Sequence, residues 1–176
     1  MRADRRSDLR ARLAALTLLA SLAVSGCLYS LTAGSFPDHI QTVAIIPFDN
    51  QTTRFELTQE IHEQLLRELP SALGVRNGGE EFADAVVRGE ITGYDVQAPL
   101  FRPGQQGDRA EVLQREVTIR IRVEIVDQIE DVILWDDTGL FAQGQYLEAS
   151  ETEEEGRAEA IELLVQKIID GAQSNW

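Results

Sequence analysis

The stretch VTIRIRVEIVD, residues 117–127, decides the fold. Apolar β-branched residues alternate in it with polar or charged ones over nine positions, the period of a β-strand with one buried and one wet face. The predicted buried face carries Val117, Ile119, Ile121, Val123 and Ile125, and the predicted wet face carries Thr118, Arg120, Arg122 and Glu124. The chain therefore contains a sheet that needs a covering layer on one side only.

Three further segments have the composition of strands. Residues 42–48 (TVAIIPF) are almost wholly apolar and predict a strand buried on both faces, which Pro47 ends because it cannot donate to a ladder. Residues 85–96 predict a strand that places Tyr94 or its neighbours on the wet face of the sheet. Residues 132–146 predict the fourth strand.

Turn residues separate these strands. Two prolines and two glycines in residues 97–110 predict a long, mobile hairpin tip, and residues 76–81 (RNGGEE) predict a turn. Residues 127–131 predict the hairpin turn between the last two strands, although it lacks the glycine typical of such turns. The last strand is expected to break near residues 136–139.

Two amphipathic helices complete the pattern. Apolar residues at helical spacing predict a helix over residues 56–69, stopped by Pro70 and Gly74. A capping box, Ser150 with Glu153 or Thr152 with Glu155, precedes a last helix that ends at Gly171. The order strand, helix, three strands, helix predicts an α+β fold. We expect two helices packed on one face of a four-stranded mixed sheet, a two-layer sandwich over residues 41–176.

The N-terminus is typical of an export signal. Residues 1–12 contain five arginines, and residues 13–24 carry no charge. This apolar run is shorter than the roughly 20 residues that span a bilayer, so we expect a transient signal rather than an anchor. The alternative is a buried N-terminal helix, but no capping residue precedes the run.

The end of the signal resembles the bacterial lipobox, a run of small or aliphatic residues that ends in cysteine. It consists of Val24, Ser25, Gly26 and Cys27, and Cys27 is the only cysteine in the chain. We expect a lipoprotein signal peptide at 1–26, lipid attachment at Cys27 and a lipidated tether at 27–40. Two or more acyl chains are what stable anchoring requires. Leu28 in place of aspartate favours the outer membrane by resemblance to enterobacterial sorting. The alternative is an ordinary cleavage site with a chance cysteine.

Charge and composition restrict the possible functions. Residues 1–26 hold five of the 16 basic and two of the 30 acidic residues, so the mature chain has 11 basic and 28 acidic residues and a net charge of −17. Such a chain repels nucleic acid. A single cysteine excludes an intramolecular disulfide.

The search for catalytic or metal-binding residues favours a binding protein. Asp136 and Asp137 are an acid pair beside Trp135 that we interpret as a solvated bend. His39 and His62 lie far apart in sequence, and lone carboxylates are their only candidate partners at close spacing. We therefore expect no enzyme activity, no metal site and no cofactor.

Several segments in order resemble the lipopolysaccharide-assembly lipoprotein family (LptE-like). They are CLYSL, FPDHIQTVAIIPFDNQTTRFELTQEIHEQL, ADAVVRGEITGYDV, VTIRIRVEIVDQIEDVILWD and SETEEEGRAEAIELLVQKII. The resemblance covers the chain from Cys27 to about Gly171. It implies a lipoprotein anchored in the outer membrane and facing the periplasm, which assembles with a large β-barrel translocon, plugs it, and helps deliver lipopolysaccharide to the outer leaflet.

Some members of this family bind lipopolysaccharide through basic residues, whereas this chain is acidic. The nearest candidates for contact with a partner or glycolipid are Arg102, Arg115, Arg120 and Arg122. The stretch VAIIPFDNQT followed by an amphipathic helix also resembles lipoproteins of the curli-secretion and peptidoglycan-synthase-activator type. These bind a periplasmic or barrel partner, and this is the alternative function. A lipid-anchored enzyme is a third reading.

Overall fold

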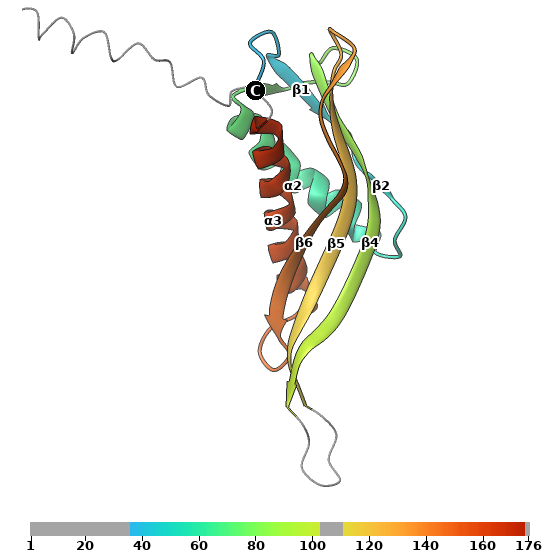
Figure 1. Cartoon of the computed structure of the whole chain (residues 1–176), viewed down its shortest axis with the longest axis vertical. Coiled ribbons are helices and arrows are strands. Elements are labelled where there is room, and N and C mark those ends of the chain that lie inside the picture. The colour runs from blue at the N-terminus through green and yellow to red at the C-terminus, as the bar shows by residue number, and fades with distance from the viewer. Residues whose placement is uncertain (1–35, 103–110, 175–176) are drawn as a thin grey trace, which may run out of the picture. The chain divides into compact units, whose positions relative to one another are not determined.

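A computed structural model of the chain describes residues 36–102 and 111–174, which form two helices packed on one mixed sheet (Figure 1). Its elements are β1 (Thr42–Ile45), β2 (Asp49–Asn50), α2 (Glu56–Leu73), β3 (Arg76–Asn77), β4 (Ala85–Arg102), β5 (Glu111–Asp127), β6 (Val132–Leu147) and α3 (Glu153–Gln173). The α+β class and the two helices on a mixed sheet are confirmed. The number of strands is not, because the sheet has six strands rather than four.

The sheet combines a parallel part with an antiparallel part. Its order is β3-β1-β4-β5-β6, with β2 pairing with β4 beyond the end of β1. β3, β1 and β4 are parallel, and β4, β5 and β6 are antiparallel. The two strands that the prediction missed are short. The predicted strand at 42–48 ends already at Ile45, and β2 lies just beyond it at Asp49–Asn50. Arg76–Asn77, assigned to a turn, pairs with β1.

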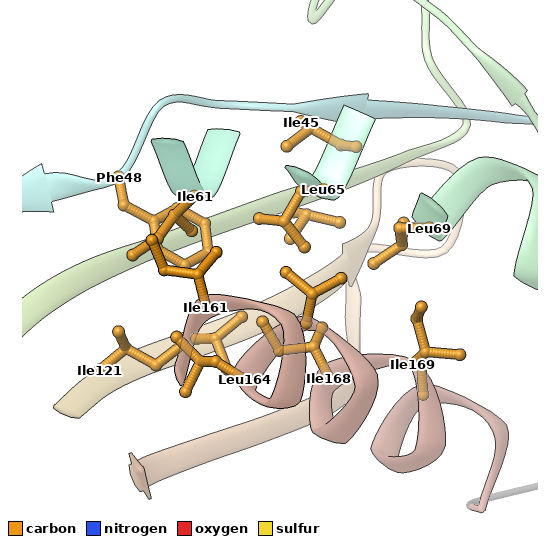
Figure 2. Packing of buried hydrophobic residues seen from close by; sticks show 14 of the residues in the cluster. Ile45, Phe48, Ile61, Leu65, Leu69, Ile121, Ile161, Leu164, Ile168 and Ile169 are labelled. Atoms are coloured by element: carbon orange, nitrogen blue, oxygen red, sulfur yellow. The ribbon is translucent and has the colours of Figure 1, made fainter. Parts of the chain in front are cut away.

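The core lies between the helices and the sheet. Figure 2 shows Leu65 and Leu69 of α2 facing Ile161 and Ile168 of α3, with Ile121 of the sheet beneath. All five predicted inward positions of residues 117–125 are buried, so the alternation in the opening stretch assigned that face correctly. Burial of this kind contributes about 1.5–3 kcal/mol for each large side chain.

Small residues let α3 lie close to the sheet. Gly144 of β6 faces Gly156 and Ala160 of α3 so tightly that a Cβ atom on Gly144 would collide with the Gly156 carbonyl oxygen and the Ala160 nitrogen. One turn from the end of the helix, Gly171 leaves room for the Trp135 ring in the same way. Glycine is required at both points by close approach, to the backbone of α3 at Gly144 and to the side chain of Trp135 at Gly171.

Helix α2 continues four residues beyond the end predicted at Leu69. Pro70 lies inside its last turn and is buried, and the helix ends at Gly74, whose φ of 72° is left-handed. The amides of Gly74 and Val75 close the turn on the carbonyls of Ser71 and Pro70. Pro70 lacks a backbone N–H group, but its carbonyl still accepts the hydrogen bond from Val75. Pro70 therefore does not mark the end of the helix.

A bulge in β4 changes which side chains face the helices. Ile91 pairs with Ile121, but Gly93 pairs with Arg120, so Thr92 is an extra residue in the ladder. Because one extra residue turns every later side chain to the opposite face, Tyr94 points to the helix side. Of the predicted options, Tyr94 or its neighbours on the wet face, Tyr94 itself is therefore wrong, whereas its neighbours Gly93 and Asp95 share the face of Arg120.

The β4–β5 hairpin is longer than predicted. Its ladder continues from Gln97, paired with Glu116, to Arg102, paired with Glu111, with two further register shifts. The first six residues of the segment assigned to a mobile tip, 97–102, are therefore strand, and residues 103–110 lie outside the described residues. β6 is also continuous where a break was predicted, because a register shift between Ile121 and Val123 absorbs the extra residues.

The β5–β6 turn forms without glycine because the aspartates at its two ends, Asp127 and Asp131, stabilise it. The Asp127 carboxylate accepts hydrogen bonds from the amides of Ile129 (2.7 Å) and Glu130 (3.0 Å). Asp131 adopts a φ of 56°, a left-handed conformation that aspartate tolerates better than most residues.

Side chains of α3 and of the loop before it cover the outer edge of β6. Glu159 accepts a hydrogen bond from the amide of Gln145 (2.6 Å), and Glu151 accepts one from the amide of Leu147 (2.6 Å). Lys167 donates to the carbonyl of Phe141 (2.7 Å) and lies over its ring. Backbone groups that a neighbouring strand would otherwise engage are thus occupied.

The described chain enters the fold as part of the core. Phe36 and Ile40, which the prediction assigned to the tether, are buried. Between these two residues lies His39, whose Nε2 is 2.5 Å from a carboxylate oxygen of the fully buried Asp127. The hydrogen bond to Asp127 raises the pKa of His39. This leaves 28–35 for the proposed tether.

Candidate partner-binding surface

The sheet face opposite the two helices is the candidate surface, and we call it the open face. Among residues 36–102 and 111–174, no helix packs on it. Its side chains come from alternate positions of β4, β5 and β6. At its centre are Arg88, Glu90, Arg122, Glu124 and Asp136.

Two cross-strand ion pairs dominate the centre of the open face. Arg88 pairs with Glu124 (2.5 Å), and the directly adjacent Arg122 pairs with Glu90 (3.3 Å). Each arginine is more than half exposed, so each pair contributes about 0–1 kcal/mol to folding. Arg120, two residues along β5, has no ion-pair partner within the described ranges, and its stem lies over Gly93.

A shallow hollow of about 490 Å³ lies over these pairs. Its charged lining consists of Asp49, Glu90, Glu124, Asp136 and Asp137 against Arg88 and Arg122. Five carboxylates and two guanidinium groups make it acidic. Electrostatics therefore favour a cationic or polar partner here over a phosphate group.

Beside this hollow, the open face becomes apolar toward the β5–β6 turn. Ala44 and Val86 are buried there against the half-buried Ile46 and Val126. Ile133, opposite Val126 in β6, is 57% exposed. The open face thus offers a charged centre beside an apolar end.

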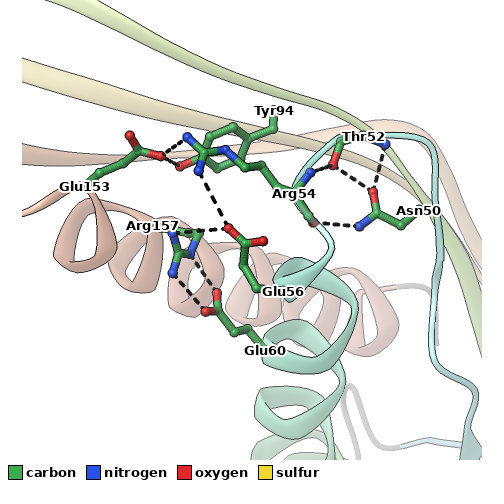
Figure 3. A network of polar contacts seen from close by, with 8 residues as sticks. All are labelled: Asn50, Thr52, Arg54, Glu56, Glu60, Tyr94, Glu153 and Arg157. Atoms are coloured by element: carbon green, nitrogen blue, oxygen red, sulfur yellow. Dashed lines mark hydrogen bonds and ion pairs between the residues drawn. The ribbon is translucent and has the colours of Figure 1, made fainter.

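On the helix side, a polar network joins both helices to the sheet (Figure 3). The Tyr94 hydroxyl of β4 donates to Glu153 of α3 (2.7 Å), and Arg54 donates to the same oxygen (2.5 Å). The Arg54 guanidinium also lies 5.1 Å from the centre of the Tyr94 ring. Burial, together with the hydrogen bond to Glu153, raises the pKa of Tyr94 above its usual range.

The second half of this network connects the helices directly. Arg157 of α3 donates two hydrogen bonds to Glu60 of α2, at 2.8 and 3.0 Å. Its side chain is only 11% exposed, and Glu60 raises the pKa of Arg157, so the guanidinium stays charged. Because every group in the network is paired within the domain, we assign it a structural role.

Most of the chain matches the model of one protein family. The model of the family described as "LptE: Lipopolysaccharide-assembly" matches residues 40–170, well over half of the 176 residues. The chain belongs to this family. The resemblance drawn from the sequence is thereby confirmed. No curated protein sequence matches the chain significantly.

Solved structures share the fold of this LptE-family chain at low sequence identity. The PelC dodecamer from Paraburkholderia phytofirmans is 15% identical, with a TM-score of 0.50, over 80% of this chain and 94% of that one. Lipoprotein GNA1162 from Neisseria meningitidis is 12% identical, with a TM-score of 0.45, over 74% and 96%. At these identities the likeness concerns the fold alone.

The structure places the four arginines predicted as contacts at three different locations. Arg120 and Arg122 lie on the open face. Arg115 lies on the opposite face of β5, where it pairs with Glu148. The backbone of Arg102 is at the far end of the β4–β5 hairpin. Val24, Ser25, Gly26 and Cys27 lie outside the described residues. No described helix is long and apolar enough to cross a membrane.

Sequence reasoning missed two sets of residues. The contact of His39 with Asp127 joins positions 88 apart, and local spacing cannot reveal such a pair. The Tyr94–Glu153 bond depends on the bulge at Thr92, for which the adjacent Gly93 is the available signal.

Proposed function

We propose that this LptE-family protein is an outer-membrane lipoprotein that assembles with a β-barrel translocon, plugs it, and takes part in lipopolysaccharide delivery to the outer leaflet. The family match over residues 40–170 carries this proposal. The role is one of assembly and is not enzymatic. The domain faces the periplasm, held by acyl chains on Cys27 after removal of residues 1–26.

The length of the tether supports a partner close to the membrane. Residues 28–35 span at most about 28 Å even when fully extended. A domain held at that distance from the bilayer meets a membrane protein at a high effective concentration, so a modest interface stays occupied. A partner within or beside the same membrane fits this reach.

The open face supplies the proposed contact with the barrel. It is free of covering helices within the described parts of the chain, and it combines ion pairs with an apolar end. We assign Arg120 and Arg122 to this contact and place Arg102 at a second one, at the end of the hairpin. Arg115 is held by Glu148 on the other side and is the weakest candidate of the four.

Affinity purification from detergent-solubilised outer membrane tests the partner. The full-length protein with a C-terminal tag should recover a large β-barrel protein. Ile133→Asp, at the apolar end of the open face, should recover much less of it, whereas Leu163→Asp on the exposed side of α3 should not differ from the natural chain. Recovery of only cell-wall synthases or curli-secretion proteins would refute the proposal in favour of the alternative function.

Metabolic labelling tests the anchor separately. A palmitate analogue should label the natural protein, and Cys27→Ser should abolish labelling because serine lacks the thiolate nucleophile. The variant should accumulate with residues 1–26 uncleaved. If the variant is labelled as strongly as the natural protein, the lipid is attached elsewhere and the assignment of Cys27 is wrong.

A further inference from the structure

We propose that His39, Asp127 and Glu130 form a binding site for one divalent transition-metal ion, for which Zn²⁺ is the best fit. One imidazole nitrogen and two carboxylate oxygens lie within 4.8 Å of one another. They come from the entry segment, the last residue of β5 and the β5–β6 turn. The site needs only the folded domain and is independent of the proposed role in lipopolysaccharide delivery.

Negative charge at this point is only partly compensated. Asp127 is fully buried, and His39 is the one cationic side chain bonded to it among the described residues. The carboxylates of Glu130 and Asp84 also act electrostatically on the same imidazole. Three carboxylates thus act on one histidine, and this leaves an excess of negative charge around the site. A dication would neutralise it.

The donor set selects the type of metal. Zn²⁺ binds imidazole nitrogen and carboxylate oxygen together, usually with four ligands, whereas Mg²⁺ and Ca²⁺ prefer sites made of oxygen alone. Two carboxylates and one imidazole leave a fourth position for water. Other late transition metals bind the same donor atoms. Their affinities for the site should follow the general order for divalent first-row metals.

Small rearrangements would complete the geometry. Zinc–ligand bonds of about 2.0–2.2 Å place tetrahedral ligand atoms about 3.4 Å apart. Glu130 is exposed and turns inward to reach this distance, while the His39 ring, 38% exposed, moves slightly away from Asp127. The metal replaces the proton between His39 and Asp127, and this proton leaves to solvent. The bound ion would tie the entry segment to the β5–β6 turn.

Calorimetric titration of the metal-stripped, full-length protein in detergent tests the proposal. Zinc chloride should bind with one equivalent per chain and raise the melting temperature, whereas magnesium chloride at the same concentration should do neither. Glu130→Gln removes a direct ligand of the metal. It should weaken zinc binding by about 10- to 100-fold or more, because mutation of residues that only support a ligand already has an effect of that size. This exposed substitution leaves the His39–Asp127 bond in place, so the fold is retained.

Two further variants make the outcome decisive. His39→Gln should also lose zinc binding. Asp136→Asn with Asp137→Asn removes more negative charge from the acidic hollow and should bind zinc as the natural chain does. Absence of one-to-one binding, an equal response to magnesium, or binding that survives Glu130→Gln would each overturn the proposal.

Discussion

Single residues in this protein act mainly through close approach. Gly144 shows this best, because the space for its side chain is taken by the backbone of α3. Glycine is needed at this position because any side chain would collide with that backbone. A glycine of this kind differs from Gly74, where the left-handed backbone conformation is the reason for the residue.

Gly144→Ala should destabilise the protein by about 1–3 kcal/mol, because the added methyl group pushes α3 off the sheet. Urea unfolding followed by circular dichroism measures the change. Gly139→Ala is the matched control in the same strand, since nothing lies within 4 Å of a Cβ at Gly139. Equal stabilities of the two variants would contradict the close packing between Gly144 and Gly156.

Tyr94 gives a prediction for alkaline pH. Its pKa is raised in the folded state, so above about pH 10 the unfolded chain loses the proton first, and the free energy of unfolding falls as pH rises. Tyr94→Phe should lower this free energy by about 1 kcal/mol at pH 7, through loss of the Glu153 hydrogen bond. It should also flatten the alkaline decline.

Denaturant unfolding between pH 7 and 12 checks this prediction. Part of the slope should remain in the variant, because burial also raises the pKa of Tyr146. The double variant with Tyr146→Phe should be flatter still. An alkaline slope that is the same in Tyr94→Phe and the natural protein would show that Tyr94 does not titrate differently in the folded state.

At the scale of elements, the Arg157–Glu60 pair fixes how α3 lies against α2. Arg157→Met should cost about 1–3 kcal/mol, because it leaves the partly buried Glu60 without its partner. Glu60→Gln with Arg157→Met should recover part of this loss. A double-mutant cycle should give a coupling energy of about 1–2 kcal/mol.

The same cycle on Arg88 and Glu124 is the control, because that pair lies on the open face and should couple by only about 0–1 kcal/mol. If both cycles give the same value, burial of Arg157 adds nothing to the helix contact. The comparison separates the effect of burial from the effect of charge.

The charge of the whole molecule opposes direct contact with lipopolysaccharide. A chain with a net charge of −14, or −17 without residues 1–26, repels a phosphorylated glycolipid. Direct binding of purified lipopolysaccharide by the full-length protein should therefore require added Mg²⁺ or Ca²⁺ and vanish with chelator. Tight binding that survives chelator and weakens with salt would show instead that a basic surface makes the contact.

The order and packing of the helices and long strands could be predicted from the sequence, whereas the short strands and the pairing of individual strand residues could not. Strict alternation in residues 117–125 and the stripe of α2 report burial directly, so the inward positions of both elements were assigned correctly. Thr118, predicted on the wet face, is buried. Two-residue strands such as β3 have no periodicity to read, and the bulge at Thr92 reversed the face of Tyr94. The arginines shared a sequence neighbourhood, but strand alternation separated Arg115 from Arg120.

The cover on the edge of β6 also bears on how copies of this chain meet. Side chains of Glu151, Glu159 and Lys167 occupy backbone groups at that edge. A strand edge without such cover is a template for pairing with a second copy. A variant truncated before α3 should therefore associate with itself more readily than the natural chain.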